Sequence, residues 1–72
     1  MLGKRLANVK QSVSKLSSDL ANQMGVPTWR VTEIEEDRGK PITVDELHSY
    51  VRACGGHLEI TAEINHRVIT IF

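Results

Sequence analysis

The sequence has a single cysteine, Cys54, among its 72 residues. One cysteine cannot form an intrachain disulfide, so a disulfide-stapled secreted domain is excluded. No apolar run is long enough to span a bilayer, and the opening MLGKRLANVK lacks the apolar centre of a signal peptide. We therefore expect a cytoplasmic protein with no membrane partner, in which Cys54 is a small buried residue at a helix end.

Residues that could form a catalytic or metal site are also scarce. The histidines His48, His57 and His66 fall in separate predicted elements. Cys54 with His57 supplies only two of the ligands that a zinc site needs. There is no recognisable phosphate-binding glycine loop and no nucleophile with an adjacent base. We expect no enzyme activity, no cofactor and no metal.

The formal net charge is zero, which counts against a large nucleic-acid footprint. The charges are unevenly distributed, however. Residues 1–30 carry five basic side chains and one acidic, whereas residues 31–72 carry four basic and eight acidic. Such a split suits a protein that faces phosphates on one side. A chain this short has a small core, so tight helix packing or dimerisation must support it.

The stretch Ser17–Glu35 has the pattern of two short helices joined by a tight turn. Between them, Gly25-Val26-Pro27 offers a glycine for positive φ and a proline for the start of the next helix. Ser17 is the expected N-cap of the first helix, and the small Ala21 allows the second helix to cross closely. This layout is typical of a DNA-binding helix-turn-helix, whose second helix lies in the major groove. Apolar residues recur at helical spacing in both segments: Leu20, Ala21 and Met24, then Val31 and Ile34.

At these positions the chain resembles the Xre family of Cro-like and phage-repressor-like helix-turn-helix proteins. The resemblance implies that Glu35 pairs with a basic residue of the first helix, here Lys10. The chain departs from the family at Lys15, where a leucine is common, and we expect the neighbouring Leu16 to pack inward. A helical hairpin that binds nothing is the alternative interpretation. The matching residues, between about Leu6 and Gly56, are Leu20-Ala21, Met24-Gly25-Val26, Val31, Ile34-Glu35 and Gly39.

The whole chain predicts an α+β fold, with a four-helix helix-turn-helix domain over residues 1–56 and a C-terminal β-hairpin over residues 57–72. The third helix is expected over Thr28 to about Glu36, with Gly39 as its stop. Thr43 and Glu46 form a capping box before the fourth helix, which Gly55-Gly56 ends. The first helix, Leu2 to about Ser12, has the apolar stripe Leu2, Leu6, Val9 and Val13. The inner face of the fourth helix is Val44, Leu47, Tyr50, Val51 and Cys54.

The hydrophobic period changes to two over His57–Ile64 and Arg67–Phe72, which indicates two strands. Asn65-His66 suits a two-residue turn. This turn pairs Ile64 with Arg67, Ala62 with Ile69, and Ile60 with Ile71. A lone hairpin is marginal in water, so we expect its apolar face to form a homodimer interface, with a fold-back onto the fourth helix as the rival. That interface consists of Leu58, Ile60, Ala62, Ile64, Ile69 and Ile71.

On the third helix, Val31 and Ile34 face the core, which predicts that Trp29, Arg30, Thr32, Glu33 and Glu36 face outward. The first residues of a recognition helix reach furthest into the major groove. Trp29 has a second interpretation, as a side chain packed beside the turn or against a partner chain. The base-reading candidates are therefore Thr28, Trp29, Thr32 and Glu33. The candidates for contacts to backbone phosphates are Ser17, Arg30, Arg38 and Lys40.

These features predict a dimeric, sequence-specific transcriptional repressor that binds double-stranded DNA at a palindromic operator. The resemblance, with a strand segment directly after the helix-turn-helix, implies an antitoxin that represses its own operon and holds a cognate toxin protein. One alternative is a small phage or plasmid regulator of Cro type without a toxin partner. Another is a protein-interaction module that has lost DNA binding. The acidic second half, with Glu33 on the presumed reading helix, favours this last alternative.

Overall fold

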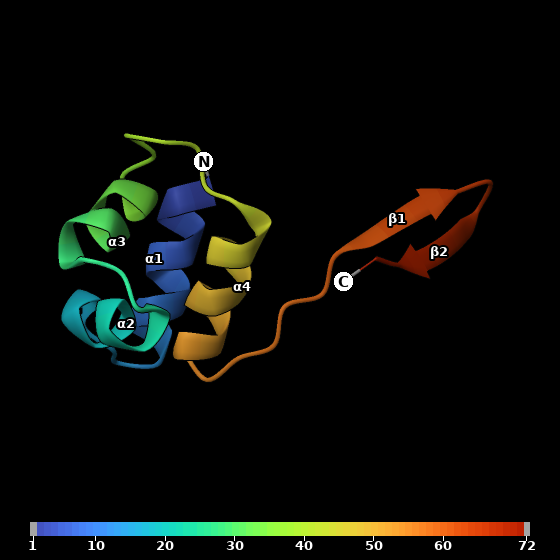
Figure 1. The fold of residues 1–72 in the computed structure, drawn as a ribbon. Coiled ribbons are helices and arrows are strands. Elements are labelled where there is room, and N and C mark those ends of the chain that lie inside the picture. The colour runs from blue at the N-terminus through green and yellow to red at the C-terminus, as the bar shows by residue number, and fades with distance from the viewer. Residues whose placement is uncertain (1, 72) are drawn as a thin grey trace.

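The computed structural model describes residues 2–71, which form four helices followed by a two-stranded antiparallel sheet (Figure 1). The predicted α+β architecture is confirmed, whereas the expected strand end at Phe72 lies outside the described residues. None of the four helices is long and apolar enough to cross a membrane. The helices are α1 (Leu2–Ser12), α2 (Ser17–Met24), α3 (Thr28–Glu35) and α4 (Val44–Ala53), and the strands are β1 (Thr61–Ile64) and β2 (Arg67–Thr70).

The helices surround one small core to which all four contribute. Burial of Cys54 at the end of α4, as predicted, raises the pKa of its thiol. The expectation that Leu16 packs inward is wrong, because this side chain is 66% exposed. Of the predicted apolar stripe, only Leu6 is buried, and the expectation is wrong for the other three residues, which are 40–42% exposed. The buried apolar residues are Leu6, Leu20, Ala21, Val31, Ile34, Tyr50, Ala53 and Cys54.

The turn between α2 and α3 forms as the sequence predicts. Gly25 adopts a left-handed conformation with φ of 72°. The amide of Val26 then donates a hydrogen bond to the Ala21 carbonyl oxygen at 3.1 Å, which closes α2. Pro27 precedes the first residue of α3, where its missing N–H leaves no hydrogen bond unmade. The two helices are thereby set at a fixed angle by a three-residue connection.

The end of α3 differs from the prediction, because Asp37 and not Gly39 makes the left-handed stop. Asp37 has φ of 56°, and the next amide, of Arg38, bonds to the Glu33 carbonyl oxygen at 3.0 Å. The Asp37 carboxylate also accepts a hydrogen bond from the Gly3 amide at 3.0 Å, at the start of α1. A Cβ atom on Gly3 would lie 2.4 Å from the Ile34 carbonyl oxygen. The first turn of α1 therefore touches the backbone of α3 directly.

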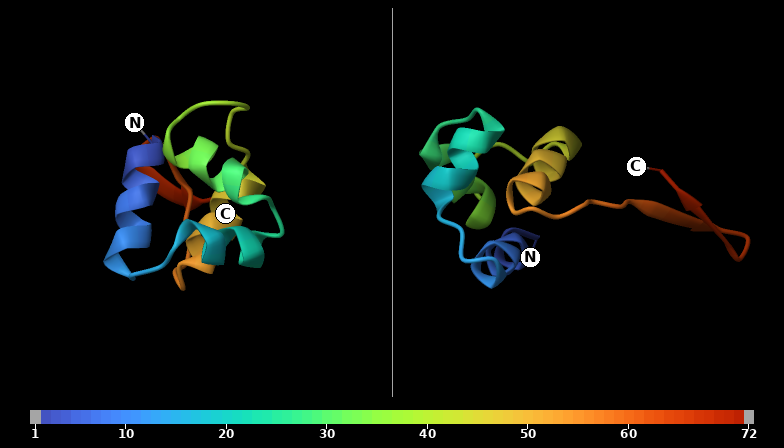
Figure 2. Two further views of the ribbon diagram at one scale, coloured as in Figure 1. Left: turned by 90° about the vertical axis from the view of Figure 1, so that its left-hand side faces the viewer. Right: turned by 90° about the horizontal axis from the view of Figure 1, so that it is seen from below.

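The hairpin has the predicted register, with Ala62 opposite Ile69 and Ile64 opposite Arg67. Both turn residues have positive φ, 52° for Asn65 and 65° for His66, as a type I′ turn requires. The regular strands are shorter than predicted, although the Ile71 amide still bonds to the Ile60 carbonyl oxygen at 2.7 Å. Over residues 2–71 neither strand contacts a helix, and the hairpin projects away from the helical body (Figure 2). The fold-back onto α4 is therefore not observed.

Candidate nucleic-acid interface

The predicted recognition helix, α3, buries one face and leaves the other open. Val31 and Ile34 are buried in the core, as predicted, and α3 packs against α2 and α1. On the opposite face Thr28 is exposed, Thr32 is half-buried and the Trp29 indole is 63% exposed. The turn in this chain thus does not cover Trp29. An exposed indole and two threonine hydroxyls at the start of a short helix can hydrogen-bond or pack on base edges in a major groove.

The expectation that Arg30 faces outward and holds a phosphate is wrong. Arg30 is only 7% exposed, and its guanidinium donates to four groups within the protein. Nε and Nη2 bind the two carboxylate oxygens of Glu46, each at 2.7 Å. Nη1 bonds to Glu33 Oε1 at 3.2 Å and to the Lys40 carbonyl oxygen at 3.0 Å, and Nη2 also reaches the Pro41 carbonyl oxygen at 3.3 Å. A guanidinium has five N–H donors, so none is left for DNA.

The fork between Arg30 and Glu46 also fixes the charge of both groups. The hydrogen bonds from Arg30 lower the pKa of the Glu46 carboxyl to about 2, with a smaller contribution from the Thr43 amide. The bond to Glu46 in turn raises the pKa of Arg30. The capping box that the sequence predicts is present, with the Glu46 amide donating to Thr43 Oγ1 at 3.0 Å. Glu46 thus serves both the start of α4 and the first turn of α3.

Glu33, a predicted base-reading residue, is turned toward the loop that follows α3. Its side chain is 22% exposed, and Arg30 holds one of its carboxylate oxygens. A Cβ atom on Gly39 would lie 2.3 Å from Glu33 Oε2, so a side chain at this position would displace the carboxylate. Gly39 also has φ of 76°, a backbone conformation that favours glycine.

The ion pair between Glu35 and Lys10, implied by the family resemblance, is present. It belongs to a hydrogen-bond network that includes more residues than predicted. Lys10 Nζ lies 3.0 Å from Glu35 Oε2, with both side chains at most 15% exposed. Ser17 Oγ accepts a bond from Lys10 at 2.8 Å and donates to Glu35 Oε1 at 3.2 Å. The Tyr50 hydroxyl lies within hydrogen-bonding distance of Glu35 Oε2 and of the Leu6 carbonyl oxygen. This network, which we call the Glu35 cluster, joins all four helices.

Ser17 therefore does not cap α2 as expected. The N-cap position belongs to Leu16, whose amide donates to Asp19 Oδ2 at 3.2 Å. Ser17 is the first helical residue, and its hydroxyl is committed to the Glu35 cluster. A phosphate at this position would have to use the first amides of α2 and not the hydroxyl.

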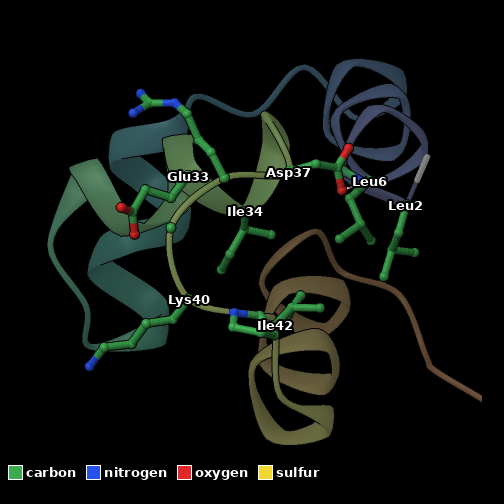
Figure 3. Close-up of a pocket in the computed structure, with 11 residues that line it drawn as sticks. Leu2, Leu6, Glu33, Ile34, Asp37, Lys40 and Ile42 are labelled. Carbon is green, nitrogen blue, oxygen red and sulfur yellow. Dashed lines mark hydrogen bonds between the residues drawn. The ribbon is translucent and has the colours of Figure 1, made fainter.

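The two other phosphate candidates lie in the loop between α3 and α4. Lys40 is exposed, and Arg38 forms an exposed ion pair with Glu36 at 2.6 Å. Close to this loop, Leu2, Leu6, Ile34 and Ile42 line a hollow of about 280 Å³ (Figure 3). In that view Asp37 turns toward α1, while Glu33 and Lys40 lie on the other side of the loop. The loop thus has an inner edge bound to α1 and an outer edge that carries the basic groups.

Comparison with known proteins gives relatives along almost the whole chain. A Mycobacterium tuberculosis (strain ATCC 25618 / H37Rv) protein named as antitoxin HigA3 is 32% identical over 72 residues, which are 99% of this chain and 66% of that protein. A solved HigA antitoxin, described as inducing DNA bending by a unique dimerization, has a TM-score of 0.80 at 30% identity and matches 90% of this chain and 85% of its own. The structure of DNA-bound antitoxin HigA3 has a TM-score of 0.79 at 30% identity, and the match covers 92% of this chain and 86% of that chain. No family model matches.

The chain belongs to the HigA antitoxin family. It spans about two thirds of the length of the mycobacterial relative. The structural match to HigA chains takes in more than the helices, because it covers at least 90% of this chain. The HigA fold here therefore includes a hairpin whose apolar side chains are open to solvent, with Ile64 at 55% and Ile71 at 64% exposure. The predicted interface residues Leu58, Ile60 and Ala62 are half-buried, and Ile69 is exposed.

Two residues that organise the site in this HigA-family chain were not predicted. Glu46 was assigned to a helix cap alone, and Tyr50 to the inner face of α4 alone. A buried tyrosine hydroxyl needs a hydrogen-bond partner, and Glu35, the family's paired glutamate, was the available acceptor. For Glu46 there was no comparable signal, because its partner Arg30 is sixteen residues away in another helix.

Proposed function

We propose that this chain is a dimeric, sequence-specific DNA-binding repressor of the antitoxin type, which represses its own operon. The observation that carries the proposal is the open face of α3, with Trp29 exposed beside a tight turn, in a chain 30% identical to a HigA3 antitoxin that binds DNA. Membership of the wider Xre family, which the helix-turn-helix residues indicate, is part of the same proposal. The interaction-module alternative loses part of its support, because the bond from Arg30 gives Glu33 a structural role.

Thr28, Trp29 and Thr32 are the residues that we propose to read bases. Trp29 can pack on a thymine methyl group, and the threonines can hydrogen-bond or touch that group. Glu33 accepts from a cytosine amine only if the bond to Arg30 leaves its second oxygen free, so it ranks behind the other three. Each good base contact contributes about 1–3 kcal/mol of discrimination. Selection of bound duplexes from a random library, followed by footprinting of alanine variants, tests this assignment.

The expected result is a relaxed sequence preference for Thr28→Ala and Trp29→Ala. A matched control is Asn8→Ala, at an exposed residue on α1, which should keep the wild-type preference. Unchanged footprints for both α3 variants would contradict the proposal that α3 reads bases in the major groove.

For the phosphate contacts we retain Arg38, Lys40 and the amides at Ser17. Arg38 and Lys40 extend from the loop after the recognition helix, where the chain passes the wall of the groove. Replacing either by methionine should weaken binding to every sequence, and should flatten the slope of log affinity against log salt by about one unit per lost contact. A slope that stays the same in both variants would mean that neither side chain touches a phosphate.

The hairpin is the proposed homodimer interface. Two strands that contact no helix are marginal alone, and a two-fold partner can cover both their apolar face and their open edge. A dimer would present two α3 helices about one DNA turn apart, which predicts a palindromic operator. Sedimentation of the whole chain and of a chain ending at Gly56 tests this interface. A dimeric truncation would move the interface to the helices, and a monomeric whole chain would contradict the dimer.

A cognate toxin protein is the remaining proposed partner, inferred from the antitoxin relatives alone. Co-expression with the product of the adjacent reading frame provides the test. A stable complex and relief of growth inhibition are expected. If neither is seen, the Cro-type regulator without a toxin becomes the better assignment.

A further inference from the structure

Arg30 joins three segments that no other single side chain connects among residues 2–71. It belongs to the first turn of α3. Its acceptors are Glu33 on the same helix, Glu46 on α4, and the carbonyl oxygens of Lys40 and Pro41 in the loop between those helices. Arg30 lies outside the apolar core, which is formed by other residues. Its position is therefore not explained by the packing of the helices.

The loop that Arg30 holds has little other internal support. Residues 36–41 are exposed and form no helix or strand, and Asp37 ties only the early part of the loop to α1. The later part, Gly39 to Pro41, rests on the Glu33 carboxylate and on the two carbonyl bonds to Arg30. Trp29 and Lys40 line the same open hollow beside Arg30, so a base-reading candidate and a phosphate-binding candidate flank it.

We propose that Arg30 is a positioning residue for DNA binding, which fixes the phosphate-binding loop relative to the base-reading end of α3. The inference rests on the proposed function. It gives Arg30, which has no donor left for a phosphate, a structural role in DNA binding. Base contacts and phosphate contacts form together only when the two elements have a set spacing, because each contact tolerates little displacement. A loop released from Arg30 would have to be ordered during binding, which weakens affinity without removing any group that touches DNA.

The geometry explains why arginine occupies this position. Its planar fork serves three carboxylate oxygens and two carbonyl oxygens at once, whereas the three donors of a lysine cannot span them. Lysine would keep the positive charge near DNA but release part of the loop. Arg30→Lys therefore separates the charge of Arg30 from its geometry.

The test measures DNA affinity for Arg30→Met, Arg30→Lys and Glu46→Gln. Arg52→Met is the matched control, since Arg52 is an exposed arginine on α4 that loses the same charge. The probes are a duplex selected from a random library by the wild-type chain and a scrambled duplex of equal length. Each variant is titrated between about 50 and about 200 mM salt. Circular dichroism and thermal melting establish which variants are folded at the assay temperature.

The expected result is at least about a tenfold loss of affinity for the selected duplex in Arg30→Met, with a salt slope about one to two units flatter, because Lys40 and Arg38 lose their set positions. Arg30→Lys and Glu46→Gln should show smaller losses in the same direction. A purely structural role would lower the melting temperature but leave the salt slope of the folded fraction unchanged. If Arg30→Met does not fold, the two milder variants decide by the same criterion.

Affinity within about twofold of Arg52→Met, with an unchanged salt slope in the folded variants, would overturn the positioning role while wild-type binding still supports the repressor. A wild-type chain that selects no duplex would overturn the proposed function itself, and this inference with it. DNA binding by the wild-type chain therefore distinguishes a failure of the positioning role from a failure of the proposed function.

Discussion

The hydroxyl of Tyr50 offers the most direct test of the Glu35 cluster. Tyr50 has no exposed surface; its ring belongs to the core, and its hydroxyl lies between the Leu6 carbonyl oxygen of α1 and Glu35 of α3. Burial, and then the adjacent Glu35 carboxylate, raise the pKa of Tyr50, so the hydroxyl remains a proton donor throughout the neutral range. Tyr50→Phe removes one oxygen atom and leaves the ring in place. The substitution therefore measures the hydrogen bond with almost no cavity term.

The expected loss follows from the acceptor. A hydrogen bond to a charged group contributes about 1.5–3 kcal/mol, and the Glu35 side chain is only 10% exposed, so water replaces the lost donor poorly. We expect Tyr50→Phe to lower the free energy of unfolding by about 2 kcal/mol. In a domain of this size such a loss lowers Tm by roughly 10 °C. Urea unfolding at a fixed protein concentration, with an unchanged m value, measures it.

A double-mutant cycle assigns the loss to Glu35. Glu35→Gln alone leaves the Lys10 ammonium without its counter-charge at 15% exposure, and should cost about 3 kcal/mol. If the hydroxyl acts through the carboxylate, Tyr50→Phe should cost about 1 kcal/mol less in the Glu35→Gln background than in the wild type. A loss below about 0.5 kcal/mol, or an equal loss in both backgrounds, would refute the role of the bond.

Three further outcomes follow from the described contacts. Gly3→Ala should destabilise the fold by about 1–2 kcal/mol despite a better helix propensity, because its Cβ meets α3 backbone, whereas Asn8→Ala on the open face of α1 should be neutral or stabilising in the same urea assay. Glu46→Gln should lose stability relative to wild type at neutral pH, and urea titrations should show that difference shrinking as pH falls from about 4.5 toward 2, because Arg30 lowers the pKa of this carboxyl. His66→Gly should slow amide exchange across β1 and β2, since glycine adopts positive φ without strain.

The features that the sequence predicts correctly depend on neighbours along the chain. Gly25 ends α2, Thr43 and Glu46 cap α4, and the Asn65-His66 turn fixes the hairpin register. Each rests on backbone geometry or hydrogen bonds within about five residues, for which a local pattern is sufficient. The pair between Lys10 and Glu35 was predicted from the family resemblance and not from spacing, and the structure confirms it.

The features that were missed depend on groups distant in the chain. Helical periodicity placed Arg30 outside because it is charged and lies between core positions, yet a long side chain can fold back when acceptors surround it. Those acceptors, on α4 and in the loop, become neighbours only in the folded chain. Leu16 shows the opposite error, since an apolar residue in a connection has no helix to turn it inward. Periodicity thus predicts the face of the helix on which a residue lies, but not the group that its side chain contacts.

The zero net charge, which counted against DNA binding, includes charges that the fold uses internally. Five carboxylates of the helical body accept hydrogen bonds from a helix N-terminus or from a buried cation, which offset their charge. Among the basic residues of the described chain, Lys10 and Arg30 are held in the interior in the same way, whereas Arg38 pairs with Glu36 at the surface. The basic groups that lie open on the helices and their loop, Lys4, Arg5, Arg38, Lys40 and Arg52, outnumber the exposed acids Glu36 and Asp45 there. The exposed surface of the helical body is therefore more basic than the composition of the chain suggests. The five carboxylates are Asp19, Glu33, Glu35, Asp37 and Glu46.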